Sequence, residues 1–344
     1  MVKIKISVPE RYPSADLSQF LDQTALATHS FHFNEQIPKA DAWFVIEGTL
    51  PEDSQCFVPP NRVFFLGAET ARPLGFFYQN SEWLPFLTQF FQIYTPQELY
   101  SDNAHLEVPF LPWMINANHG PHFFDSSTRD LEFFRSHQVP VKTRELSVFC
   151  SAKEITPEHG SRLRFVSELK NHFGPRLDWF GNGVNAVDEK WEGLAPYKYS
   201  IVLENQAASH VLTEKIQDAF LALSKPIYWG APQARDIFPP DSFTEIDIRD
   251  LRGSITHIEE LLKGDSYQKS LPALLKAKAI VTDELNFMVR IQNILVDPKL
   301  GSPGPKQNVV IQPVSHFRRL APPAQRNPAQ RLFDNLVRRY RAQD

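Results

Sequence analysis

Residues 197–229, which read YKYSIVLENQAASHVLTEKIQDAFLALSKPIYW, contain the pattern that decides the fold. Residues 199–204 (YSIVLE) predict a buried strand, because aromatic and β-branched residues run together up to a carboxylate. Residues 213–224 (TEKIQDAFLALS) predict a helix with Thr213 as its N-cap, and residues 226–229 (PIYW) predict a second strand. Two strands joined through a helix form a βαβ unit, in which the strands are parallel.

The same alternation continues on both sides of this unit. The further strands predicted in this half are 146–150, 177–180 and 243–246, and the helices are 159–173, 187–194, 254–263 and 271–296. Alternating strands and helices indicate a parallel sheet with helices on both faces. The second half of the chain is therefore predicted to be an α/β domain.

The first half is more aromatic and less regular. Its predicted strands are 3–8, 42–47, 62–66 and 91–94, its predicted helices are 84–91 and 129–137, and 101–122 predicts loops. At about 150 residues per domain, the 344 residues predict two domains.

Composition excludes several classes of protein. The formal net charge is −4, so no general basic face for nucleic acid is expected. The two cysteines, Cys56 and Cys150, exclude a disulfide framework and a four-thiolate zinc site. Met1 leads directly into a strand pattern rather than a signal peptide, and no apolar run is long enough to span a membrane. We therefore expect a cytoplasmic protein.

Candidate chemistry lies where strands end. Ligands of parallel α/β sheets bind beyond the carboxyl ends of the strands, which here are followed by 151–164, 181–185 and 204–215. A helix that opens Thr213-Glu214-Lys215 presents N–H groups and a lysine to an anion such as phosphate, and Glu214 can accept hydrogen bonds from sugar hydroxyls. The alternative is a solvated Glu–Lys pair.

Two arginines open the helix of the preceding βα unit. Arg162 and Arg164 are two residues apart, so at most one of them should face the strand ends. The alternative is that both lie on the surface.

The glycine-rich segment 181–186 (GNGVNA) also fits the GxGxxA fingerprint of dinucleotide-binding proteins, with Glu204 about twenty residues later. However, the segment that follows it, 185–198, is short and polar and contains Gly193 and Pro196. A glycine turn between strand and helix is therefore the preferred interpretation over an NAD site.

Glu69 follows the predicted strand 62–66 in aromatic surroundings, where a carboxylate can act as a general base. An ordinary exposed loop glutamate is the alternative. Two histidine pairs, His29 with His32 and His119 with His122, lack an accompanying carboxylate pattern, so no metal site is predicted.

The end of the chain changes character. Residues 298–313 predict a Pro/Gly-rich connector, and residues 315–344 contain seven arginines against two aspartates. After Asn327-Pro328, a helix with one apolar face and a basic rim is expected. Such a helix can contact anionic lipid as a peripheral membrane segment, or it can dock on the N-terminal domain.

Residues 197–250 resemble the signature region of the α1,3/4-fucosyltransferases of glycosyltransferase family 10. The elements that match are the YKY at 197–199, Glu204-Asn205, Thr213-Glu214-Lys215, PIYWG at 226–230 and FPPDSF at 238–243. The similarity extends over about residues 147–262. More weakly, RVFFLGAET at 62–70 stands where the family has a strand followed by a Glu-Ser-Pro-like turn.

The resemblance implies an α/β protein of the GT-B fold, with two Rossmann-like domains that face a central cleft. It implies an N-terminal acceptor-binding domain (1–140), a C-terminal GDP-sugar-binding domain (141–297) and a connector with a basic amphipathic helix (298–344). The implied activity is an inverting transfer of L-fucose from GDP-fucose, without a metal, to an oligosaccharide or lipid-linked glycan. The linkage would be α1,3 to N-acetylglucosamine or glucose of a surface glycan.

The resemblance also assigns roles to single residues. The implied contacts are Arg162 and Lys215 to the diphosphate, Glu214 to fucose, Tyr197 and Asn205 to the nucleotide, with Glu69 as general base. Val211 stands where the family has an aromatic residue, and Thr70-Ala71 replace Ser-Pro after Glu69. Another GDP-sugar as the donor, or a catalytically silent nucleotide- or glycan-binding protein, therefore remain alternatives.

Overall fold

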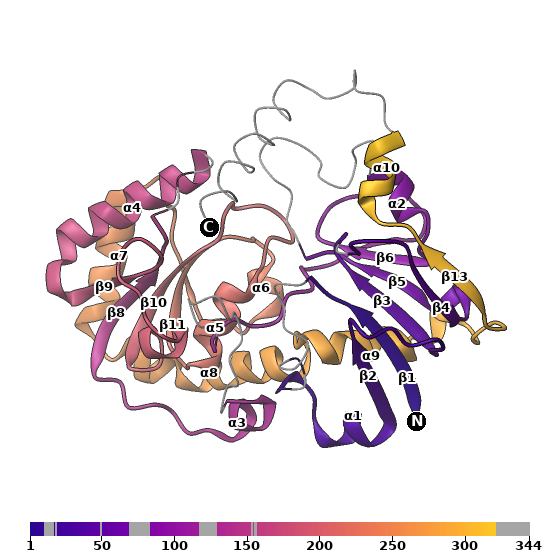
Figure 1. Ribbon diagram of the computed structural model, residues 1–344. Coiled ribbons are helices and arrows are strands. Elements are labelled where there is room, and N and C mark those ends of the chain that lie inside the picture. The colour runs from indigo at the N-terminus through magenta and orange to yellow at the C-terminus, as the bar shows by residue number, and fades with distance from the viewer. Residues whose placement is uncertain are drawn as a thin grey trace. The chain divides into compact units, whose positions relative to one another are not determined.

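The computed structural model describes residues 1–9, 17, 19–48, 50–68, 83–116, 129–152, 154 and 157–320. The chain divides into two compact units (Figure 1). The first comprises residues 1–9, 29–107 and 301–344, and the second comprises 10–28 and 108–300.

This division differs from the predicted boundaries 1–140, 141–297 and 298–344, because residues 10–28 and 108–140 belong to the second unit. Polar side chains of helix α9 (Phe287–Val296) and of its N-cap hold both segments there. Arg290 donates to the carbonyls of Val108 and Pro109, each at 2.7 Å, and Asn286 donates to the carbonyl of Phe20 at 3.0 Å. Such side-chain-to-carbonyl contacts leave no periodic pattern in the sequence.

The first unit contains a six-stranded parallel sheet in the order β2-β1-β3-β5-β6-β7. Its strands are β1 (Val2–Ser7), β2 (His29–Phe33), β3 (Ala42–Ile46), β5 (Val63–Leu66), β6 (Gln92–Thr95) and β7 (Ala104–Leu106). The four strands predicted in this half are therefore confirmed as β1, β3, β5 and β6. Strands β2 and β7 were missed, because only one of their eight residues is buried and polar residues interrupt both.

A second pairing in the same unit joins distant parts of the chain. Strand β13 (Gln307–Ile311) pairs antiparallel with β4 (Ser54–Val58), and α10 (Val314–Leu320) packs against α2 (Trp83–Leu87). The connector predicted for 298–313 thus contains a strand, which the surrounding Pro and Gly residues obscured. The basic helix expected after Asn327 lies outside the described residues.

The second unit contains a five-stranded parallel sheet in the order β12-β11-β10-β8-β9. Its strands are β8 (Arg144–Phe149), β9 (Leu177–Phe180), β10 (Tyr197–Leu203), β11 (Lys225–Trp229) and β12 (Thr244–Glu245). Its longer helices are α4 (Pro157–Phe173), α5 (Glu214–Leu221), α7 (Leu251–Lys263), α8 (Ser266–Asp283) and α9, and its shorter ones are α1 (Gln23–Thr28), α3 (Leu131–Ser136) and α6 (Ala234–Ile237). Among the described residues, no helix is both long and apolar enough to cross a membrane.

The connectivity of this sheet reverses its direction between β8 and β10. From β8 the chain passes through α4 outward to β9, whereas from β10 it passes through α5 in the opposite direction to β11. Helices α4 and α7 therefore pack together on one face and α5 and α8 on the other (Figure 1). Ligands of such sheets bind where the direction reverses, which is between the ends of β8 and β10.

The glycine segment after β9 is a tight turn and not the opening of a helix. Gly181 and Gly183 have φ angles of 143° and 78°, and Gly181 forms an antiparallel bridge with Asn185. The next element is a 3₁₀ turn, η5 (Lys190–Gly193). The interpretation of this segment as a glycine turn is confirmed.

The stability of the first unit depends on a core of packed aromatic side chains around Phe65. The ring of Phe65 lies 6.2 Å from Trp83, 6.0 Å from Phe86 and 5.5 Å from Phe90, and Phe65 is fully buried. Phe65→Ala is expected to lower the free energy of unfolding by about 3–5 kcal/mol, because it leaves a cavity. Urea unfolding measures this value.

The control for this variant is Leu84→Ala on α2, whose side chain is 48% exposed. Its unfolding free energy should stay within about 0.5 kcal/mol of the wild type. Equal losses in the two variants would show that the aromatic cluster is not the core of this unit.

Candidate functional site

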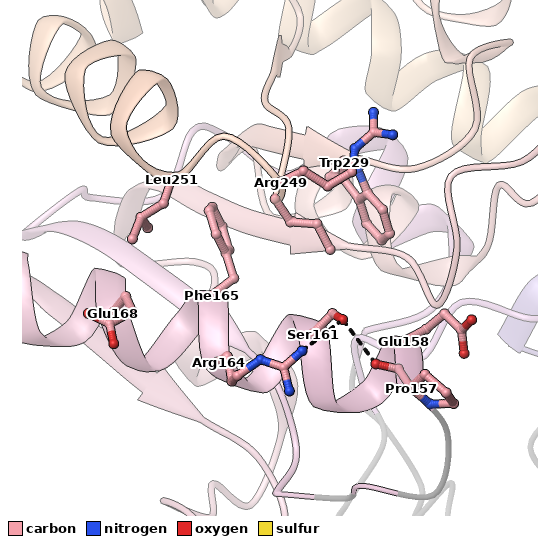
Figure 2. Close-up of a pocket in the computed structure, with 10 residues that line it drawn as sticks. Pro157, Glu158, Ser161, Arg164, Phe165, Glu168, Trp229, Arg249 and Leu251 are labelled. Atoms are coloured by element: carbon pink, nitrogen blue, oxygen red, sulfur yellow. Dashed lines mark hydrogen bonds between the residues drawn. The ribbon is translucent and has the colours of Figure 1, made fainter.

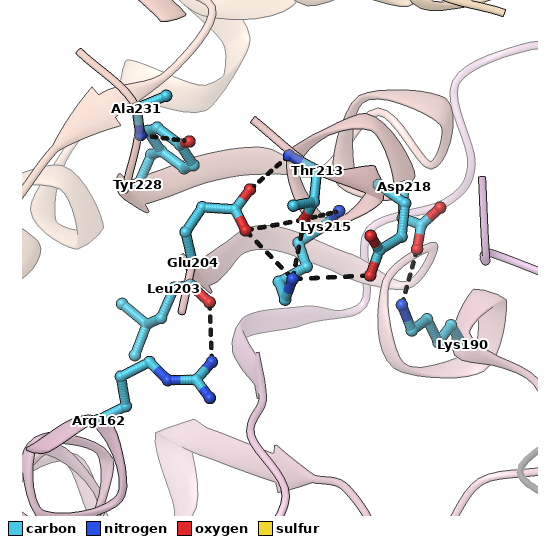
Figure 3. Close-up of polar contacts among 10 residues, drawn as sticks. Arg162, Lys190, Leu203, Glu204, Thr213, Lys215, Asp218, Tyr228 and Ala231 are labelled. Atoms are coloured by element: carbon cyan, nitrogen blue, oxygen red, sulfur yellow. Dashed lines mark hydrogen bonds and ion pairs between the residues drawn. The ribbon is translucent and has the colours of Figure 1, made fainter. Parts of the chain in front are cut away.

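A buried carboxylate lies at the end of β10. Glu204 follows this strand directly and is 0% exposed. It accepts hydrogen bonds from the Thr213 N–H and hydroxyl, each at 2.8 Å, and from Lys215 Nζ at 3.1 Å (Figure 3). A carboxylate that is buried away from solvent requires such donors. Glu204 therefore fixes the first turn of α5 against the end of β10.

Thr213 is the N-cap of α5, as predicted. Its hydroxyl accepts from the Lys215 N–H at 3.5 Å and from Lys215 Nζ at 2.8 Å, while donating to Glu204. Burial lowers the pKa of Lys215, but the carboxylates of Glu204 and Glu214 outweigh it and raise that pKa above its usual value. Lys215 is thus held as a cation at the start of the helix.

Glu214 is the first residue of α5. Its side chain is 15% exposed, and its carboxylate lies 3.7 Å from Lys215 Nζ. Burial alone would raise its pKa, yet Lys215 and Lys190 bring the pKa of Glu214 below its usual value. The carboxylate is therefore an ionised acceptor in the first turn of α5.

Arg162 reaches the same place from α4. It is 8% exposed, and its Nη1 donates to the carbonyl of Leu203 at 3.2 Å. Its Nε is buried and has no hydrogen-bond partner in the part of the chain that the structure describes. Burial lowers the pKa of Arg162, while Cys150 and Glu204 oppose that shift. A buried guanidinium with an unmatched donor is suited to an anionic ligand.

The prediction that Arg162 and Arg164 point to different faces of the helix is confirmed. Arg164 points to another face of α4, where it is exposed and donates to the Ser161 hydroxyl at 3.2 Å.

The end of β11 completes the site through a glycine. A Cβ added at Gly230 would lie 2.2 Å from the Tyr228 hydroxyl and 2.5 Å from Cγ of Glu204. The Tyr228 hydroxyl accepts from the Ala231 N–H at 2.9 Å. Gly230 thus allows the end of β11 to approach Glu204 closely. The role of Gly230 was not predicted, because in the sequence it stood out only as the last residue of the PIYWG motif.

The structure places the other predicted residues differently. Asn205 is exposed beside Glu204. Tyr197 is buried at the amino end of β10, opposite Arg144, and its hydroxyl donates to Asp178 at 2.8 Å. Leu203 lies six steps further along the strand, a distance of about 20 Å. The predicted nucleotide contact of Tyr197 therefore disagrees with this geometry. The predicted base, Glu69, lies outside the described residues.

A cavity of about 450 Å³ lies beside the N-terminal half of α4 (Figure 2). Glu158, Arg164 and Phe165 line it on the helix, and Trp229 and Leu251 line it opposite (Figure 2). Because Trp229 ends β11, the cavity lies at the carboxyl edge of the sheet. Its volume suits a ligand of nucleoside size.

His29 and His32 lie in β2, where His32 contacts Glu35 at 2.8 Å. No group of three or more metal-binding side chains occurs among the described residues. His119 and His122 fall outside them.

Residues 139–269 match the model of glycosyltransferase family 10 (fucosyltransferase), C-terminal part. The second unit is therefore similar to the domain of this family over these residues. This confirms the resemblance drawn from the motifs at 197–250.

Two curated relatives are similar to the chain over this domain. An α-(1,3)-fucosyltransferase (FucT) from Helicobacter pylori is 37% identical over 76 residues, which are 22% of this chain and 16% of that protein. An α-(1,4)-fucosyltransferase from Arabidopsis thaliana is 27% identical over 125 residues, 31% of each chain. The matches thus span less than a third of either relative.

A solved α-glucosyltransferase, in complex with UDP and DNA, shares the fold. The structures superpose with a TM-score of 0.51 at 10% identity, over 86% of this chain and 100% of that one. The predicted α/β fold of the GT-B class is confirmed by this likeness and by the two parallel sheets.

The close approach of Gly230 to Tyr228 and Glu204 leaves no room for a Cβ at this position. Gly230→Ala should lower the free energy of unfolding by about 1–3 kcal/mol, because the added Cβ forces Tyr228 and Glu204 apart. Denaturant unfolding followed by tryptophan fluorescence measures the change.

Gly264→Ala is the matched control, since its Cβ would meet only the Ser266 nitrogen, at 4.0 Å. Its stability should be nearly unchanged. If Gly230→Ala is as stable as this control, then the site tolerates a side chain and the proposed packing is wrong.

Proposed function

We propose that this protein is an inverting fucosyltransferase that moves L-fucose from GDP-fucose to a hydroxyl of a saccharide. The observation that supports it best is the meeting of Arg162 and Lys215 around Glu204, within the residues that match the family 10 model. The charge of Lys215 is paired with the carboxylates of Glu204 and Glu214, whereas Arg162 donates to the neutral carbonyl of Leu203. Arg162 therefore has charge available for a diphosphate.

The proposed reaction moves negative charge onto the departing GDP. The bond between the anomeric carbon and the phosphate oxygen breaks, and its electron pair leaves with GDP. Negative charge grows on the diphosphate, where Arg162, Lys215 and the N–H groups of α5 stabilise it without reorganising. The acceptor oxygen attacks from the opposite side of the ring, which inverts the configuration.

The acceptor hydroxyl must lose its proton as it attacks. Glu69 is proposed as the base, and this assignment depends on the position of RVFFLGAET in the family pattern. Glu214 is proposed to accept the sugar hydroxyls, because it is ionised and partly exposed next to Lys215. Asn205 is proposed to contact the nucleotide.

No metal is proposed. The sequence has no Asp-x-Asp motif, and two cations can supply the charge that a metal supplies elsewhere. The transfer rate should therefore be unchanged by EDTA.

We further propose an α1,3 linkage to N-acetylglucosamine or glucose of a surface glycan, with an oligosaccharide or a lipid-linked glycan as the acceptor. The name of the Helicobacter pylori relative supports the linkage. The arginines of 315–344 support a peripheral site at an anionic cytoplasmic membrane surface.

The first test concerns the cation. Arg162→Met keeps the approximate volume but removes the charge, and it should weaken GDP binding by about 100-fold, close to 3 kcal/mol. Isothermal titration calorimetry measures the affinity. Arg176→Met, which removes an exposed arginine that pairs with Glu145 in the same unit, is the control and should bind GDP as the wild type does. Equal affinity in both variants contradicts the assignment.

The second test concerns the base. Glu69→Gln should reduce transfer from GDP-fucose by about 10²–10⁴-fold while leaving GDP affinity unchanged. Release of GDP in the presence of acceptor measures the rate. If the wild type and the variant are equally inactive although both bind GDP, the protein is a catalytically silent nucleotide-binding protein.

A further inference from the structure

A second buried ion pair lies one turn further along α5. Asp218 is 1% exposed and Lys190, on η5, is 15% exposed, and their charged atoms are 2.9 Å apart (Figure 3). Asp218 also accepts the Met114 N–H at 2.8 Å. Neither Lys190 nor Asp218 belongs to the motifs that indicated the donor site.

The pair borders Glu214. Asp218 and Glu214 are four residues apart, so their carboxylates lie on the same side of the helix and repel each other. The groups that face Asp218 are Lys190 from η5, Glu214 from α5 and the Met114 N–H from the segment before α3. Lys190 is therefore the cation that two carboxylates share.

The position of Lys190 is fixed by its neighbours. The Trp191 N–H donates to the carbonyl of Ile115 at 3.0 Å, and Arg129 pairs with Glu189. The guanidinium of Arg129 also lies 4.8 Å above the ring of Trp191. These contacts hold η5, so Lys190 approaches α5 from a defined direction.

A buried ion pair is costly compared with apolar side chains, and its best-attested use is to fix geometry. The geometry that this pair can fix is that of the first turn of α5, where Glu214 and Lys215 lie. We propose that Lys190 and Asp218 are positioning residues that keep the Glu214 carboxylate directed at the sugar of the donor. This inference rests on the sugar-binding role proposed for Glu214.

The pair introduces a pH dependence. Burial raises the pKa of Asp218 to about 6, although Lys190 opposes the rise. Below that pH, Asp218 is protonated, and the charge of Lys190 then acts on Glu214 alone and competes with the sugar hydroxyls. The preference for GDP-fucose over GDP should therefore decrease as the pH falls through about 6.

The decisive variant is Asp218→Asn, which removes the charge but can still accept the Met114 N–H. Its affinity for GDP should equal or exceed that of the wild type, whereas its affinity for GDP-fucose should fall about tenfold. The pH step in the ratio of the two dissociation constants should also disappear. Calorimetry with each nucleotide between pH 5 and 8 measures all three quantities.

A matched control is Glu145→Gln, which removes a carboxylate that pairs with Arg176 at 2.7 Å in the same unit. The ratio of the two dissociation constants and its pH step should remain as in the wild type. A parallel loss of affinity for both nucleotides in Asp218→Asn would show a purely structural role and would overturn the inference.

A measurement without the donor sugar nucleotide distinguishes this inference from the proposed function. In the ligand-free protein, Lys190→Met should raise the pKa of Glu214 and Asp218→Asn should lower it, as followed by carboxyl NMR. An unchanged Glu214 titration in both variants contradicts the inference even if the enzyme binds GDP-fucose. Failure of the wild type to bind GDP-fucose overturns the proposed function instead, and the titration still decides whether the pair acts on Glu214.

Discussion

The site depends on one fully buried carboxylate. Glu204 directly follows β10, six of whose seven residues are buried, and it is itself 0% exposed. Its hydrogen bonds to Thr213 and Lys215 join β10 to α5, and Gly230 allows β11 to approach it. The ends of β10 and β11 and the start of α5 are thereby held together around the Glu204 carboxylate. Any ligand at this edge meets donors that are already in place, which reduces the cost of reorganisation.

The cations near Glu204 have different surroundings. Lys215 lies between two carboxylates, which keep it charged and fixed. Arg162 donates to a backbone carbonyl and has a buried Nε without a partner among the described residues. Burying a guanidinium with an unpaired N–H donor costs free energy. An anion that accepts a hydrogen bond from that donor offsets the cost on binding. The departure of a diphosphate is the step of the proposed reaction that needs such charge most.

Local patterns predicted much of the fold. The βαβ unit around 199–229, the N-cap at Thr213 and the turn at Gly181 each follow from nearest neighbours in the chain, and the structure confirms them. The strand β13 and the assignment of 10–28 to the second unit depend on partners hundreds of residues away, such as Phe20 with Asn286. Periodicity contains no information about such pairings.

The site shows the same limit. Motif spacing brought Arg162, Glu214 and Lys215 to one place, because βα connections end at one edge of a sheet. Tyr197 belonged to the same motif but lies at the amino end of its strand. Lys190 and Asp218 have no motif and became visible only through their 2.9 Å contact.

We propose that this edge of the sheet binds a GDP-sugar, and a thermal-shift titration with GDP-fucose, GDP-mannose and UDP-glucose tests this proposal. A ligand that binds only the folded state raises the unfolding temperature according to its affinity. We expect both guanine nucleotides to raise the unfolding temperature, GDP-fucose the most, and UDP-glucose to leave it unchanged. An unchanged unfolding temperature with every GDP-sugar would contradict it.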